Sequence, residues 1–133
     1  MFGAIADTHA VIWYLLDSPR LSKRAAAEFE RCQTNGMLVG VSSMTIIEIV
    51  YLIEKNRIPE LTLDLLKERL QQPGAPLEIV PITHDIASAV QLVSRDQVPD
   101  LPDRVIAATA VHLGVQLISG DGKIRVSDVE TIW

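Results

Sequence analysis

Residues 103–121, DRVIAATAVHLGVQLISGD, decide the fold because they join a helix directly to a strand. The periodic segment 103–113 predicts a helix, and Gly114 marks its end, since glycine readily adopts the left-handed conformation that closes a helix. The apolar run 115–118 has the length of a buried strand. A helix that leads straight into a strand of a parallel sheet must run antiparallel to it. Asp103 is therefore expected at the carboxyl edge of that strand.

The rest of the chain repeats this alternation of strands and helices. Apolar runs of strand length lie at 1–6, 37–41, 77–82 and 115–118, and the tail 130–133 is a candidate edge strand. Helical periodicity covers residues 8–16, 22–34, 45–55, 62–72, 84–95 and 103–113. Because the strands are apolar throughout, they predict a parallel sheet that helices cover on both faces. No linker or internal repeat divides the chain, so we expect an α/β fold in one domain, residues 1–133.

The composition is typical of a globular domain. Of the 133 residues, 48% are apolar and 22% charged, and the formal net charge is −5. The longest apolar run, 11–16, is far shorter than the about 20 residues that cross a membrane, so no membrane span is expected. Cys32 is the only cysteine, which excludes an intrachain disulfide and favours a cytoplasmic protein. The negative charge by itself argues against nucleic-acid binding, because most domains that bind nucleic acids are basic.

Four acidic residues are expected at the carboxyl edge of the sheet, where ligands collect in open α/β folds. Asp7 directly follows the first strand, and Asp121 follows the fourth. Glu48 lies in the first turns of the helix after the second strand, and Asp103 opens the helix before the fourth. Crowded carboxylates repel one another unless a cation lies between them. A hard divalent cation such as Mg²⁺ or Mn²⁺ suits these oxygen ligands, and it can align water for hydrolysis of a phosphodiester.

Each acid also has a purely structural interpretation. Asp7 could cap the first helix, Asp121 could belong to a tight turn, and Asp103 could simply complement the helix dipole. Glu48 stands three residues after Thr45, which is the spacing of a capping box. Capping needs only one side chain per helix, however, so the joint arrival of four acids at one edge favours a metal site.

Four segments of the chain resemble PIN-domain ribonucleases, in particular the VapC-like toxins of toxin–antitoxin pairs. They are IADTHAVIW at 5–13, VSSMTIIEI at 41–49, DRVIAATA at 103–110 and LISGD at 117–121. The resemblance covers nearly the whole chain and implies a three-layer α/β/α fold, Rossmann-like, with a central parallel sheet. It also implies an Mg²⁺- or Mn²⁺-dependent endoribonuclease that hydrolyses RNA with metal-activated water. Its partners would be the RNA substrate and a cognate antitoxin, and it would commonly form a homodimer.

The resemblance also assigns the site residue by residue. It matches the family's catalytic acids to Asp7, Glu48, Asp103 and Asp121. The three aspartates would hold the metal directly, whereas Glu48 would bind it through water or orient the nucleophile. Two hydroxyl residues match supporting positions, Ser119 and, more weakly, Thr8.

Two departures from the family pattern lie close to these acids. Leu101 and Pro102 separate Asp100 from Asp103, where relatives often place proline directly after the first acid, so Asp100 is a candidate substitute ligand. Asp121 is flanked by Gly120 and Gly122, which are smaller than the residues often found there and could loosen this ligand.

Other features leave alternatives open. His9 stands one helical turn before Trp13 and is expected to stack on it, and Arg104 is expected to pair with a neighbouring acid. The apolar segments 13–16 and 51–53 are candidates for the groove that takes an antitoxin helix, with ordinary core packing as the alternative. The competing functions are a haloacid-dehalogenase-like phosphatase, a phosphoacceptor receiver, and a PIN scaffold that acts only by binding a partner.

Overall fold

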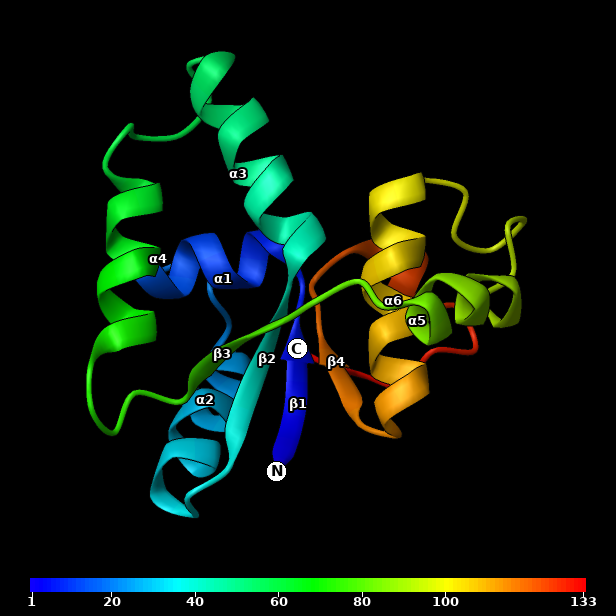
Figure 1. Ribbon diagram of the computed structural model, residues 1–133, viewed down its shortest axis with the longest axis horizontal. Coiled ribbons are helices and arrows are strands. Elements are labelled where there is room, and N and C mark those ends of the chain that lie inside the picture. The colour runs from blue at the N-terminus through cyan, green and yellow to red at the C-terminus, as the bar shows by residue number, and fades with distance from the viewer.

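A central sheet of five parallel strands organises the computed structural model, which describes residues 1–133. The strands are β1 (Phe2–Ala6), β2 (Leu38–Ser42), β3 (Leu77–Val80), β4 (Gln116–Ile118) and β5 (Thr131–Ile132). Their order across the sheet is β3-β2-β1-β4-β5 (Figure 1). The chain therefore builds one half of the sheet outward from β1 and then returns to the other side of β1. This reversal makes the gap between β1 and β4 the topological switch point, where open α/β sheets bind ligands.

Helices occupy most of the connections between strands. Their bounds are α1 (Thr8–Leu15), α2 (Lys23–Thr34), α3 (Ser43–Glu54), α4 (Thr62–Gln71), α5 (His84–Ala89), α6 (Leu101–Leu113) and α7 (Gly122–Arg125). A short 3₁₀ helix, Val90–Leu92, follows α5. None of these helices combines the length and the apolar content that a membrane crossing requires.

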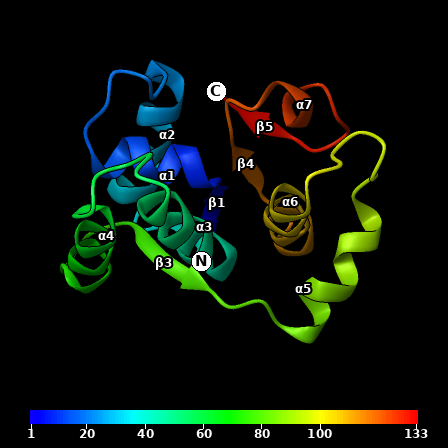
Figure 2. The ribbon, with the colours of Figure 1, turned by 90° about the horizontal axis from the view of Figure 1, so that it is seen from above.

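Two apolar clusters lie on opposite faces of the sheet because successive strand residues point to opposite sides. In β1, Ala4 and Ala6 belong to the cluster covered by α1, α2 and α4, whereas Ile5 belongs to the cluster covered by α5, α6 and α7. Figure 2 shows these two groups of helices on either side of the strands. The predicted three-layer α/β/α arrangement with a parallel sheet is thus confirmed.

The turns at the strand ends explain how the acidic residues reach one edge. The Asp7 side chain caps α1 directly after β1, and the Ser42 side chain caps α3 directly after β2. At the other end of the sheet, Gly114 closes α6 with a φ of +67°, a conformation that costs glycine little, and leads into β4. As expected, α6 runs antiparallel to the strands and begins at their carboxyl edge, at the top of Figure 1.

The predicted helix over 84–95 is correct only in its first half. The chain leaves helical geometry at Val93, because the Arg104 guanidinium donates to the backbone carbonyls of Val90 and Val93 over 2.8–3.2 Å. These bonds satisfy carbonyls at the end of the helical segment. The prediction that Arg104 pairs with an acid is therefore wrong. Sequence periodicity also placed the start of α6 at Asp103, whereas the helix begins at Leu101 with Asp100 as its cap.

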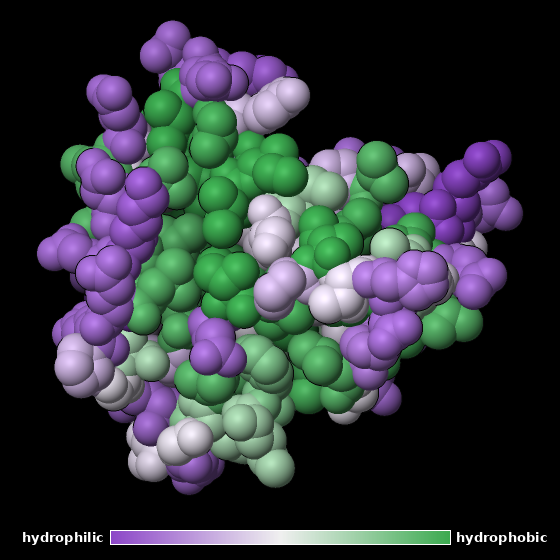
Figure 3. All heavy atoms as spheres, viewed as in Figure 1, coloured by the Kyte–Doolittle hydropathy of each residue, from purple (hydrophilic) through white to green (hydrophobic).

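The surface around α3 is apolar. Figure 3, in the same view as Figure 1, shows hydrophobic side chains gathered over α3 and the centre of the molecule, with hydrophilic side chains along α4 at the left border. Two α3 residues on one side of the helix, Ile47 and Tyr51, are 49% and 59% exposed. They are four positions apart, so they form one continuous strip.

Candidate active site

A cavity of about 550 Å³ lies at the carboxyl edge of the sheet. All four predicted catalytic acids line it, together with the candidate substitute ligand Asp100. The remaining lining residues are Thr8, His9, Val98, Pro99, Gly122 and Lys123. The fold therefore brings the predicted acids into one cavity from the ends of β1 and β4 and the beginnings of α3 and α6.

Asp7 is the most buried of these acids, with 6% of its surface exposed. One carboxylate oxygen accepts a hydrogen bond from the Ala10 amide over 2.9 Å, so the capping interpretation is correct as well. Burial raises the pKa of Asp7, and the neighbouring Ser119 side chain opposes that rise. Ser119 is itself fully buried, which agrees with a supporting role next to this acid. Asp7 thus caps α1 and lines the cavity at the same time.

Glu48 is held by two buried threonines. The Thr8 hydroxyl donates to Glu48 Oε1 over 2.5 Å, and the Thr8 and Thr45 hydroxyl oxygens lie 3.1 Å apart. Because Thr8 has a single hydroxyl proton and gives it to Glu48, Thr45 must be the donor to Thr8. Burial raises the pKa of Glu48, and the Thr8 hydrogen bond opposes this effect.

The capping-box interpretation of Glu48 is wrong. Helix α3 begins at Ser43 with Ser42 as its cap, so the third position after the cap is Thr45 and not Glu48. The Glu48 carboxylate instead accepts from the Thr8 hydroxyl. Sequence reasoning missed Thr45 as a functional residue, although one signal was present. Thr45 precedes Glu48 by one helical turn, and it therefore lies on the same helix face.

Asp103 shows the strongest effect of crowding. Its pKa is raised to about 7, first by burial and then by the charges of Asp100, Asp121, Glu48 and Asp7. Asp100 Oδ2 accepts from the Asp103 amide over 3.1 Å and so caps α6. The two acids are therefore adjacent in space as well as in sequence, and both have access to the cavity.

Asp121 is exposed and caps the short helix α7, which sequence reasoning described only as a turn. Its Oδ1 accepts from the Lys123 and Ile124 amides at 3.0 Å each, and its own amide donates to Ser119 Oγ over 3.1 Å. Gly120 is required by packing, since a Cβ there would lie 2.5 Å from the Trp133 ring. The contact with Trp133 thus explains why residue 120 is glycine. The Asp121 carboxylate is oriented by its hydrogen bonds to the first amides of α7.

The charge of the cavity fits a divalent cation. Five carboxyl groups line it, and the only basic side chains among the lining residues are Lys123 and His9. No three His, Cys, Asp or Glu side chains are already arranged around a common point that could hold a metal ion. The donor set is made of hard oxygen atoms, and these fit a divalent cation such as Mg²⁺.

The sheet order and the position of the cavity define the class of this protein as a three-layer α/β domain with an acidic site at the switch point between β1 and β4. Residues 4–129 match the PIN domain model, and the chain belongs to the PIN domain family. The family predicted from the sequence is thereby confirmed.

A relative in sequence and two similar solved structures support the assignment of the chain to this family. The chain is 28% identical over 125 residues to Ribonuclease VapC22 of Mycobacterium tuberculosis, covering 94% of this chain and 92% of that protein. Among solved structures, it resembles DNA-bound VapBC from Salmonella typhimurium with a TM-score of 0.72 at 18% identity, covering 98% and 97% of the two chains. VapBC2 from Rickettsia felis, bound to a promoter DNA fragment, gives a TM-score of 0.71 at 16% identity and covers 96% of both chains. At these identities the structural likenesses establish the fold.

Proposed function

We propose that this protein is a metal-dependent endoribonuclease and the toxin of a toxin–antitoxin pair. The observation that carries the proposal is the convergence of four acids from four separate segments on one cavity of a PIN domain. The relative in M. tuberculosis is named a ribonuclease, and several structures with this fold are toxin–antitoxin complexes. These likenesses support the same activity here and disfavour the phosphatase and receiver alternatives.

The acids have distinct roles in the proposed site. Asp7, Asp103 and Asp121 would hold Mg²⁺ or Mn²⁺, with Asp100 as a further candidate ligand. A divalent ion bound there supplies Lewis acidity, which lowers the pKa of water and offsets the charge of the phosphate oxygens. Glu48, fixed by the Thr8 hydroxyl, would bind the ion through a water molecule or orient the attacking water. Water adds to phosphorus, the bond to the 3′ oxygen breaks, and the products carry a 5′-phosphate and a 3′-hydroxyl.

The sharpest test compares acids inside and outside the cavity. Asp7→Asn should abolish Mg²⁺- or Mn²⁺-dependent cleavage of single-stranded RNA, and EDTA should abolish cleavage by the wild-type protein. Asp64→Asn is the matched control, since Asp64 is an exposed acid in the first turn of α4 and does not line the cavity. Cleavage retained by Asp7→Asn with an unchanged cut-site pattern would overturn the assignment. Metal-dependent phosphoryl labelling of Asp7 would instead favour a phosphoacceptor.

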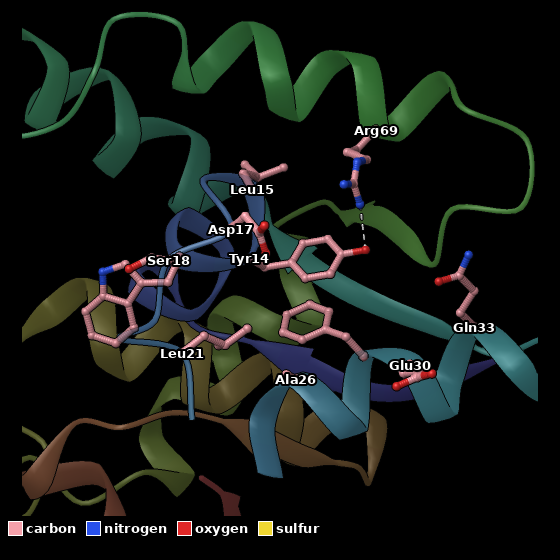
Figure 4. A pocket seen from close by; sticks show the side chains of 11 residues that line it. Tyr14, Leu15, Asp17, Ser18, Leu21, Ala26, Glu30, Gln33 and Arg69 are labelled. Carbon is pink, nitrogen blue, oxygen red and sulfur yellow. Dashed lines mark hydrogen bonds between the residues drawn. The ribbon is translucent and has the colours of Figure 1, made fainter. Parts of the chain in front are cut away.

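A second cavity, of about 440 Å³, is our candidate for the antitoxin groove. It is lined by α1 and α2 with Arg69 from α4, as Figure 4 shows. Tyr14 stacks on Phe29 with ring centroids 4.2 Å apart, and Arg69 donates to the Tyr14 hydroxyl over 2.7 Å. The predicted groove segment 13–16 therefore contributes to this cavity, but segment 51–53 does not.

The other partner and location predictions remain to be tested. A homodimer would be detected by light scattering of the purified protein, and the exposed strip of Ile47 and Tyr51 on α3 is apolar surface that such an interface could cover. Purification together with a small protein encoded beside this one would support antitoxin control. A cytoplasmic location and a single-domain organisation stay predictions from the sequence.

A further inference from the structure

An aromatic cluster extends from the candidate active site. His9 lines the acidic cavity and is exposed, and its ring lies 5.6 Å from that of Trp13 with an interplanar angle of 49°. The predicted contact of His9 with Trp13 is therefore present, but the two rings are tilted and not stacked. His9 is two residues from Asp7, so the cluster begins beside the most buried acid of the site.

Trp13 is in turn held by two distant segments. The Trp133 ring lies 5.6 Å from the Trp13 ring, and the Arg20 guanidinium carbon lies 4.8 Å above it. Trp133 also packs against the bare Cα of Gly120, the residue directly before Asp121. His9 is thus supported by α1, by the loop after α1 and by Trp133, which directly follows β5. Trp133 links this support to the backbone at the acidic edge of the sheet.

Core packing explains the two tryptophans but not the histidine. Trp13 and Trp133 are partly buried and contact the apolar cluster on their face of the sheet, whereas His9 is exposed and adds little to that cluster. The exposed His9 ring, held in position by Trp13 at the wall of a polar cavity, has the properties of a surface on which a base can stack. Unpaired bases stack on aromatic side chains and on arginine planes, and they do so largely without regard to sequence.

The charge of the chain points to the same kind of contact. The chain has 12 basic residues against 17 acidic ones, so its net charge of −5 gives little overall attraction for the phosphates of an extended RNA. Near the cavity the available cations are Lys123, which lines it, and Arg20, which lies over Trp13. Affinity for RNA must therefore come in part from contacts with bases, and His9 is the aromatic side chain that the cavity presents.

We propose that His9, braced by Trp13, is the surface on which an unpaired base next to the scissile phosphate stacks. This inference rests on the proposed ribonuclease function and makes it more specific, because it requires a substrate that is single-stranded at the cut site. Trp13 and Trp133 act as positioning residues, and Gly120 allows their packing.

The first experiment measures binding of a fluorescent single-stranded RNA that contains a mapped cut site, with Ca²⁺ in place of Mg²⁺ to prevent cleavage. His9→Ala should weaken binding about 5- to 150-fold, the range of one lost base-stacking contact. His9→Phe should bind within about 3-fold of wild type, because it keeps the aromatic face. His112→Ala, an exposed histidine on α6 outside the cavity, should bind like wild type. Equal binding by wild type and His9→Ala would overturn the proposal, and so would a loss in His9→Phe as large as that in His9→Ala.

A second experiment connects the residue to a particular base. Replacing the nucleotide on either side of the cut site by an abasic ribose should weaken wild-type binding at one of the two positions by the same factor as His9→Ala. At that position the abasic change should not weaken binding by the His9→Ala variant any further, because the stacking partner is already missing. Additive losses would overturn the inference while leaving the ribonuclease proposal intact. A wild-type protein that neither binds nor cleaves RNA would overturn both.

Discussion

Helix α1 lies between two cavities with opposite chemistry. At its beginning, Asp7 and Thr8 line a cavity in which five carboxyl groups repel one another, and the pKa of Asp103 is raised to about 7. Near its end, the Tyr14 ring stacks on that of Phe29, and the Arg69 guanidinium lies 5.0 Å from the centroid of the Tyr14 ring. Each group therefore has a favourable neighbour; Figure 4 shows Tyr14 and Arg69. From this comparison we expect that repulsion in the acidic cavity lowers the free energy of unfolding, whereas the contacts in the aromatic cavity raise it.

The largest expected effect comes from removing one charge of the acidic cavity. Asp103→Asn should lower RNA cleavage by at least about 1000-fold, because the acid acts with the others as a unit. In metal-free protein, the same change should raise the melting temperature, since one source of repulsion is lost. Cleavage kinetics and calorimetry in EDTA measure the two effects, with Asp64→Asn as the control. Cleavage within tenfold of wild type, or a lower melting temperature, would contradict the contrast between the cavities.

The reverse behaviour is expected at the aromatic cavity. Phe29 is 1% exposed and stacks on Tyr14, so Phe29→Ala should lower the free energy of unfolding by about 3 kcal/mol. Cleavage per folded molecule should stay unchanged, because Phe29 does not line the acidic cavity. Urea denaturation gives the stability, and titration of active protein gives the folded fraction. A loss of activity beyond the unfolded fraction would show that the two cavities are coupled.

A smaller effect is expected from the threonine that holds Glu48 indirectly. Thr45→Val keeps the shape of the side chain but removes the hydroxyl that donates to Thr8, so Mg²⁺ affinity and cleavage should fall about 10-fold. Thr45→Ser should restore both, because it keeps the donor. Calorimetric titration with Mg²⁺ separates this positioning role from simple packing. Equal Mg²⁺ affinity in Thr45→Val and wild type would refute the role.

The smallest effect is a dependence of stability on pH. In metal-free protein the pKa of Asp103 is raised from 3.8 to about 7, so between these values the folded state keeps a proton that the unfolded state releases. This contribution to stability is therefore present below pH 4 and is lost as the pH rises towards 7. The melting temperature in EDTA should therefore fall by several degrees between pH 5 and pH 8. Asp103→Asn should reduce this decrease in melting temperature. An equal decrease in the variant would show that another titratable group causes it.

The local sequence pattern was sufficient to predict that Asp7, Asp103 and Asp121 lie at one edge of the sheet, because each stands next to the start or end of a strand or helix. The sequence directions of those elements then determine which edge the residues reach. The end of α5 could not be predicted in this way, since it depends on Arg104 reaching back 11 and 14 residues to two carbonyls. The contact of Trp133 with Gly120 and the bond from Thr45 to Thr8 are likewise tertiary, and no periodicity in the sequence reports them.

The position of β1 in the middle of the sheet has a consequence for biosynthesis. β1 is made first, yet one of its two neighbours, β4, begins only at Gln116. A growing chain that has not reached β4 leaves one edge of β1 unpaired, and its cavity lacks Asp121. The acidic edge of the sheet is therefore complete only after β4 and Asp121 have been made. If the proposed ribonuclease activity requires Asp121, we expect the nascent chain to cleave no RNA before the segment after β4 is made.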